Sequence, residues 1–274
     1  MRKLNSNSDF SDFTPTMSRD LTYFISDLHL GASYIESPRE HERRVVDFLR
    51  SIAPRARRLV LLGDVLDYWW EYTTVVPRGY TRFFGALAEL ADSGVELHWL
   101  KGNHDIWIFD YLPNEIGFTL HDGIMTAEWD GRRFLLEHGD GVGRLPTSFR
   151  ILRRLFRNRF AQWLYSFLPP RLTIGFAHGW SSHSRRKGGQ MKLPADQADN
   201  PLVEWAEEYN MTHRQAKVDY FVFGHQHILL DRELQAGGRV IVLGDWIDKF
   251  SYGVWDGTSF SLKKFDESGE STSY

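Results

Sequence analysis

The chain has 274 residues, of which 42% are hydrophobic and 25% are charged, and it contains no cysteine. This is the composition of a globular protein with one large domain or two small ones, and it excludes a disordered or fibrous chain. The lack of cysteine excludes disulfides, thiolate zinc sites and a cysteine nucleophile, and it fits a reducing, cytoplasmic location. No apolar run approaches the ~18 residues that a membrane span requires.

The net charge of −3 conceals a strong asymmetry along the chain. Residues 141–195 contain eleven Arg or Lys and no Asp or Glu, whereas the other 219 residues carry a net charge of −14. A basic block attached to an acidic body indicates a local attraction for an anionic partner.

Short apolar runs separated by glycine and polar clusters dominate the chain between two polar ends. We expect a disordered leader over 1–20 and a polar tail over 266–274. The runs are rich in Val, Ile, Leu, Phe and Tyr, which is typical of buried strands. They are Leu21–Ser26, Arg58–Leu62, Glu96–Leu100, Arg133–Glu137, Tyr220–Phe223 and Arg239–Leu243. Helical patterns at Glu40–Ile52 and Thr81–Ala91 separate the first three, which favours a layered α/β fold.

The basic block carries an apolar pattern of its own. Side chains recur at steps of three and four residues, namely Phe149, Leu152, Phe156, Phe160, Trp163, Leu164 and Phe167. This spacing predicts one amphipathic helix that ends at Pro169-Pro170. Because the block interrupts the alternation of strands and helices, we interpret about 142–195 as a helical insertion in a domain of residues 21–265.

Three interpretations of this insertion remain open at the level of sequence. Its aromatic face could cover acyl chains while its arginines meet phosphate or an anionic membrane surface. It could instead be an amphipathic helix that packs on its own domain. A basic and aromatic segment could also bind nucleic acid, although the acidic body makes that the least favoured of the three.

Polar side chains with metal-binding chemistry follow the predicted strands. In chain order they are Asp27 and His29, Asp64, Asn103 with His104 and Asp105, His138, and finally His225 and His227. The carboxyl ends of strands in an open α/β sheet meet at the crevice where such sheets bind ligands. In D-x-H and H-x-H the two side chains of an extended segment point to the same face, so both can reach one site.

The ligand types and their number indicate two metal ions. Carboxylate, imidazole and amide groups without a thiolate suit Mn²⁺, Fe²⁺ or Zn²⁺. Seven such side chains are too many for one ion but suit two ions that share a bridging carboxylate. Two adjacent ions clamp an oxyanion and activate a water molecule, which predicts hydrolysis of a phosphate ester.

The order D-x-H, G-D, G-N-H-D, H-G and G-H-x-H resembles the calcineurin-like metallophosphoesterase superfamily. The resemblance implies a four-layer α/β/β/α sandwich, and in-line attack of a metal-bound hydroxide on phosphorus. One metal would be held by Asp27, His29, Asp64 and His227, and the second by Asp64, Asn103, His138 and His225. His104 would stabilise the transition state or protonate the leaving oxygen, and Asp105 would orient His104.

Several further segments are similar to the UDP-2,3-diacylglucosamine hydrolases of lipid A synthesis. They are G-D-V-L-D-Y-W-W (63–70), H-G-D-G (138–141), the basic and aromatic insertion, S-S-H-S-R-R-K (181–187) and L-G-D-W (243–246). This resemblance implies release of UMP and 2,3-diacylglucosamine 1-phosphate, a cap over the acyl chains, and peripheral binding of a cytoplasmic enzyme to the inner membrane. Candidate substrate contacts are Arg153, Arg154, Arg157, Ser184, Arg185 and Lys187, since such side chains bind phosphate oxygens.

One residue departs from the narrower family. Well-studied members have Arg where this chain has His104, and arginine cannot act as a general acid. The alternative substrates are therefore a soluble phosphodiester, a phosphomonoester or a nucleotide. A non-catalytic binding scaffold is a minor alternative, because degenerate members lose ligands and all of them are present here.

Overall fold

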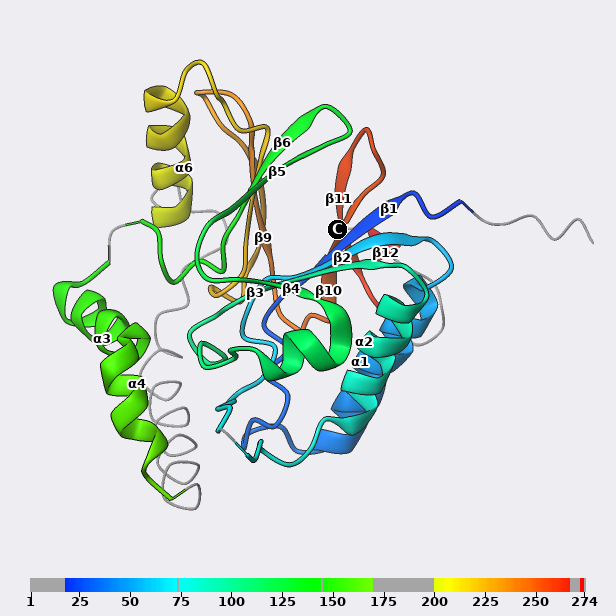
Figure 1. Ribbon diagram of the computed structural model, residues 1–274. Coiled ribbons are helices and arrows are strands. Elements are labelled where there is room, and N and C mark those ends of the chain that lie inside the picture. Colours follow the sequence, from blue (N-terminus) through cyan, green and yellow to red (C-terminus); the bar gives the residue numbers. More distant parts are fainter. Residues whose placement is uncertain (1–17, 73, 144, 170–199, 267–271, 274) are drawn as a thin grey trace, which may run out of the picture.

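The computed structural model describes residues 18–72, 74–143, 145–169, 200–266 and 272–273. The larger sheet contains β1 (Leu21–Ile25), β2 (Ala56–Leu61), β3 (Glu96–Leu100), β4 (Thr119–His121), β10 (Ser251–Trp255), β11 (Phe260–Lys264) and β12 (Thr272–Ser273). The smaller sheet contains β5 (Met125–Trp129), β6 (Arg132–Leu136), β7 (Tyr220–Phe223), β8 (Leu229–Glu233) and β9 (Arg239–Leu243). Figure 1 shows the two sheets facing each other.

The strands that precede the predicted ligands are parallel within each sheet. The larger sheet has the order β12-β11-β10-β1-β2-β3-β4, in which β1 to β4 run parallel. The smaller sheet has the order β5-β6-β7-β9-β8, and β6, β7 and β9 are parallel. The carboxyl ends of β1, β2 and β3 therefore meet at one edge, and those of β6 and β7 meet at another.

Helices cover the outer face of each sheet. The larger sheet packs against α1 (Pro38–Ile52) and α2 (Thr81–Asp92), whose buried side chains join one core cluster with it. The smaller sheet packs against α6 (Pro201–Thr212) through residues such as Leu202 and Ala206. A third cluster, which includes Phe24, Phe134 and Trp255, fills the space between the sheets. The expected four-layer α/β/β/α sandwich is confirmed.

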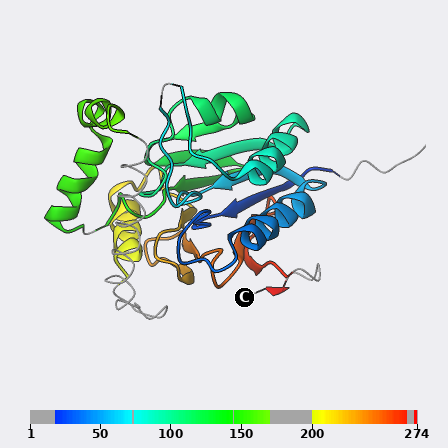
Figure 2. The same cartoon turned by 90° about the horizontal axis from the view of Figure 1, so that it is seen from below.

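The described part of the insertion contains two helices where the apolar spacing predicted one. They are α3 (Thr147–Arg157) and α4 (Arg159–Ser166), and they stand to one side of the sandwich (Figures 1 and 2). The prediction of a continuous helix was wrong at Asn158, which has extended backbone angles of φ −75° and ψ 120°. Its side chain accepts a hydrogen bond from the Ala161 amide at 3.0 Å and so begins a new helix.

Among the described residues, no helix is long and apolar enough to cross a membrane. A short π-helix, η1 (Pro113–Gly117), precedes β4. Near the chain end, Thr272–Ser273 pairs with β11 inside the segment that we expected to be a polar tail.

Candidate metal centre and adjoining cavity

Five predicted ligands have a backbone conformation that L-residues seldom adopt. The φ angles are 56° at Asp27, 46° at His29, 51° at Asp64, 65° at His225 and 52° at His227. A residue in this left-handed region costs of order 1–3 kcal/mol, and such residues gather where function requires them. The turns after β1, β2 and β7 therefore hold these side chains at a cost in backbone energy.

The side chains from these turns form three contiguous groups. The groups are Asp27, His29 and His227; His29, Asp64 and His104; and Asp64, His138 and His225. Within each group the candidate ligand atoms all lie within 4.8 Å of one another. Asp64 belongs to two of the groups, which is the position that a bridging carboxylate requires.

Within the described part of the chain, three predicted ligand atoms are buried and have no hydrogen-bond partner. They are Oδ1 of Asp27, Oδ1 of Asn103 and Nε2 of His138. Buried polar atoms are almost always satisfied in folded proteins, so unsatisfied ones call for an explanation. Each of these three atoms has a free lone pair and needs a partner that accepts electrons. A cation is such a partner, and it can bind several lone pairs at once. These residues fit a dinuclear site for divalent cations.

The outer nitrogens of two histidines are already engaged. Nδ1 of His138 donates to the Leu62 carbonyl at 2.7 Å, and Nδ1 of His29 lies 3.3 Å from Oδ1 of Asp67. Such contacts fix the tautomer and the orientation of an imidazole. They leave Nε2 of both rings facing the Asp64 carboxylate, at 3.3 Å for His138 and 3.8 Å for His29.

Within the cluster, carboxylates and imidazoles shift each other's pKa values in opposite directions. Burial alone would lower the pKa of His29, but the carboxylates of Asp27 and Asp67 raise it to about 9. Burial alone would raise the pKa of Asp64, but His138 and His104 hold it well below its usual range. Without a cation the His29 imidazole therefore holds a proton more tightly than usual, and binding of a cation would displace that proton.

His104 lies beside the cluster with its side chain fixed. Its amide donates to Oδ1 of Asp64 at 2.8 Å, and its Nδ1 donates to the Asp67 carbonyl at 2.9 Å. Nδ1 also lies 3.4 Å from Oδ1 of Asp67. The remaining nitrogen, Nε2, lies 4.0 Å from Oδ2 of Asp64 and faces the centre. His104 is therefore placed to act on a group bound there.

Asp105 does not perform the role expected of it. Its fully buried carboxylate accepts from the Gly102 amide at 2.7 Å, the Val65 amide at 3.0 Å and Nε1 of Trp99 at 3.2 Å. The carboxylate that lies beside Nδ1 of His104 belongs to Asp67, which the sequence reasoning missed. The signal was present as a second Asp in G-D-V-L-D, three positions after Asp64. Asp105 instead ties the turn after β2 to the turn after β3.

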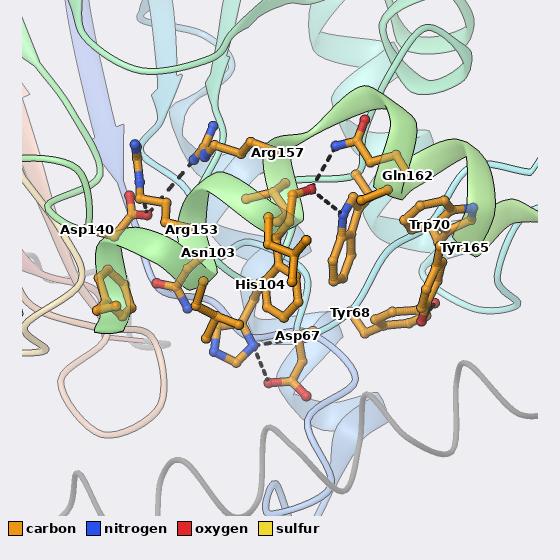
Figure 3. Close-up of a pocket in the computed structure, with 17 residues that line it drawn as sticks. Asp67, Tyr68, Trp70, Asn103, His104, Asp140, Arg153, Arg157, Gln162 and Tyr165 are labelled. Carbon is orange, nitrogen blue, oxygen red and sulfur yellow. Dashed lines mark hydrogen bonds and ion pairs between the residues drawn. The ribbon is translucent and has the colours of Figure 1, made fainter. Parts of the chain in front are cut away.

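A mostly apolar cavity of about 380 Å³ adjoins His104 (Figure 3). One wall comes from the body, with Tyr68, Trp70, Asn103, His104 and Trp107, and the other comes from α3 and α4, with Phe149, Leu152, Phe156 and Tyr165. Tyr165 packs on Trp70 and Trp107 with ring centroids 4.3 and 6.0 Å apart. The insertion thus faces the candidate metal centre across an aromatic pocket.

Of the six candidate substrate contacts, two line the cavity, one does not, and three lie outside the described residues. Arg153 and Arg157 line the cavity, where Arg153 pairs with Asp140 at 2.9 Å and Arg157 with Asp122. Among the described residues, Nε and Nη2 of Arg157 have no hydrogen-bond acceptor, and Nη2 lies 3.9 Å from Oδ2 of Asp140. Arg154 is exposed and does not line the cavity. The other three, Ser184, Arg185 and Lys187, lie outside the described residues.

Comparison with known proteins agrees with this geometry. Residues 21–229 match the profile of the calcineurin-like phosphoesterases, and the chain belongs to that family of metal-dependent phosphoester hydrolases. Within it, the chain is 42% identical to the UDP-2,3-diacylglucosamine hydrolase of Porphyromonas gingivalis, over 91% of this chain and 99% of that protein. Proteins of the same name from Haemophilus influenzae and Stenotrophomonas maltophilia are 28% and 32% identical, over 91% and 88% of this chain and 96% and 97% of theirs.

Proposed function

We propose that this protein hydrolyses the diphosphate of UDP-2,3-diacylglucosamine and releases UMP and 2,3-diacylglucosamine 1-phosphate. The observation that carries the proposal is the continuity of the aromatic cavity with His104 and Asn103. A substrate that occupies both the candidate metal centre and the aromatic cavity has a phosphoester in the first and an apolar group in the second. The names of the relatives support the same substrate. A soluble phosphoester, the alternative substrate, would leave the aromatic walls unused.

In this proposal Asp27, His29, Asp64 and His227 hold one cation, and Asp64, Asn103, His138 and His225 hold the second. Manganese is the ion we favour, with Fe²⁺ or Zn²⁺ as alternatives that suit the same oxygen and nitrogen ligands. When bound, the cations supply Lewis acidity, which lowers the pKa of water and neutralises charge on the phosphoryl oxygens.

His104 would act on the substrate through Nε2. Because Nδ1 donates to the Asp67 carbonyl, Nε2 can carry a proton only when the ring is an imidazolium. In that state it can stabilise negative charge on the phosphoryl group or donate its proton to the leaving oxygen. Asp67 lies close enough to stabilise the imidazolium, with Oδ1 3.4 Å from Nδ1.

Arg153 and Arg157 would bind the phosphate oxygens of the substrate. Both side chains reach the end of the cavity that contains Asn103 and Asp140 (Figure 3). Arginine donates charge-assisted hydrogen bonds to phosphate, and Nε and Nη2 of Arg157 make no hydrogen bond within the described part of the chain. We propose no contact for Arg154, which is exposed and does not line the cavity.

The acyl groups should dominate substrate selection. We expect kcat/KM for UDP-2,3-diacylglucosamine to exceed that for UDP-N-acetylglucosamine by at least ~10³-fold, because each buried methylene contributes ~0.8 kcal/mol. Parallel steady-state assays with both nucleotide sugars would measure the ratio. Similar kcat/KM values, or preferential turnover of a generic phosphodiester, would contradict the lipid assignment.

We further propose that the enzyme is cytoplasmic and binds an anionic membrane surface through α3 and α4. Within the described part of the chain, these helices expose large apolar side chains, namely Ile151, Leu155, Phe160, Trp163, Leu164 and Phe167. Exposed arginines, Arg150, Arg154 and Arg159, lie among them. An apolar face with a basic border suits the interface of an anionic bilayer.

A charge placed in this face should weaken membrane binding. We expect Trp163→Glu to reduce co-sedimentation with phosphatidylglycerol-containing vesicles several-fold, because it puts a carboxylate against anionic lipid. Met211→Glu is the matched control, since Met211 on α6 and Trp163 are both 55% exposed. Equal binding by both variants and the wild type would overturn the membrane proposal.

A further inference from the structure

The L-G-D-W segment forms a tight turn that the proposed reaction does not use. The Asp245 carboxylate is buried, and its Oδ1 accepts from the amides of Ile247, Asp248 and Lys249 at 3.0, 2.8 and 3.2 Å. Its Oδ2 accepts from Nζ of Lys249 at 2.6 Å. A carboxylate with this many donors is held rigidly in place.

The same turn contacts two residues of one candidate metal group. The Trp246 amide donates to the main-chain carbonyl of Asp27 at 3.1 Å, and its indole is buried in the core. Oδ2 of Asp245 lies 3.8 Å from Nδ1 of His227. The other nitrogen of His227, Nε2, lies 3.2 Å from Oδ1 of Asp27.

We propose that Asp245 is a positioning residue for one of the two metals only, the one assigned to Asp27, His29, Asp64 and His227. Its carboxylate, 3.8 Å from Nδ1, orients the His227 ring so that Nε2 faces Asp27. The second group depends on a different contact, because Nδ1 of His138 donates to the Leu62 carbonyl. The inference rests on the proposed two-metal assignment.

Loss of the Asp245 charge should therefore weaken one metal site and spare the other. We expect full-length Asp245→Asn, equilibrated in buffers of graded free Mn²⁺, to show one of its two binding steps shifted ~10–100-fold to higher concentration, which is the usual effect of such outer contacts. Bound manganese per chain reports the steps. Electron paramagnetic resonance at intermediate Mn²⁺ should show an uncoupled single ion in the variant and a coupled pair in the wild type.

Asp256→Asn is the matched control for loss of a carboxylate that accepts hydrogen bonds within a turn. Asp256 likewise accepts amide hydrogen bonds, from Thr258 and Ser259 at 2.9 and 2.8 Å, but lies in an exposed turn. This variant should keep both wild-type binding steps. If Asp245→Asn shifts both steps equally or neither, the inference is wrong. If the wild type itself binds fewer than two ions, the two-metal assignment fails instead.

Discussion

Asp64→Ala should bind neither metal ion and should have no measurable activity. Asp64 is shared by two of the three groups of ligand atoms, and its carboxylate lies 3.3 Å from His138 and 3.8 Å from His29. Removing it takes away the bridge and the carboxylate nearest to Nε2 of His138, whereas His29 keeps its contacts with Asp27 and Asp67. Elemental analysis of the purified protein and an assay with saturating Mn²⁺ would measure both effects.

A second variant separates loss of the site from loss of the fold. Asp64→Asn keeps an oxygen that can accept the hydrogen bond from the His104 amide, but it removes the negative charge. We expect this variant to fold, as judged by circular dichroism and thermal unfolding, and still to lack a metal pair. Full turnover with two bound ions in either variant would refute the two-metal account.

His104→Ala should keep both metal ions and lose activity by ~10²–10⁴-fold, the usual contribution of a general acid or base. The side chain contacts Asp67 and faces Asp64, and its removal leaves every proposed ligand in place. Single-turnover rates at fixed substrate, with metal content determined on the same sample, would test this expectation. A variant that loses metal in proportion to activity would make His104 a ligand.

His104→Arg distinguishes the two roles open to His104. Arginine stays positively charged, so it can stabilise a phosphoryl transition state but cannot release a proton to a leaving group. If charge stabilisation dominates, the arginine variant should recover most of the activity that the alanine variant loses. If proton donation dominates, both variants should be similarly slow.

The strands that carry ligands were the most predictable part of the fold. Runs such as Glu96–Leu100 and Tyr220–Phe223 are buried on both faces after their first residue, so their sequences alone identify them, and their observed bounds match. Strands such as β8 and β10 were missed, because their sequences, L-L-D-R-E and S-Y-G-V-W, mix polar residues or glycine with apolar ones. Their place in the sheet depends on pairing with β9 and β1.

The candidate site was predictable in its residue types and not in its outer contacts. Strand ends and spacing were enough to gather Asp27, His29 and Asp64 in one place, because the topology of parallel strands requires it. The pairing of His104 with Asp67, and of Asp105 with main-chain amides, depends on how two turns cross. Spacing along one chain carries no such information.

The role of the insertion could not be predicted from its sequence alone. The apolar pattern predicted a single amphipathic face, but the break at Asn158 lets α3 and α4 present different side chains to the cavity and to solvent. Phe149 and Phe156 of this pattern line the aromatic pocket, whereas Phe160 and Phe167 are each 67% exposed. One stripe thus supplies both the cavity wall and the proposed membrane surface.

In the proposed reaction a two-metal centre hydrolyses a lipid-linked nucleoside diphosphate beside the aromatic cavity. Incubation with UDP-2,3-diacylglucosamine and Mn²⁺ in ¹⁸O-labelled water, followed by mass spectrometry, tests it most directly. We predict one ¹⁸O atom in UMP and none in 2,3-diacylglucosamine 1-phosphate, because water attacks the phosphorus next to uridine. No UMP, or label in the lipid product alone, would contradict the account.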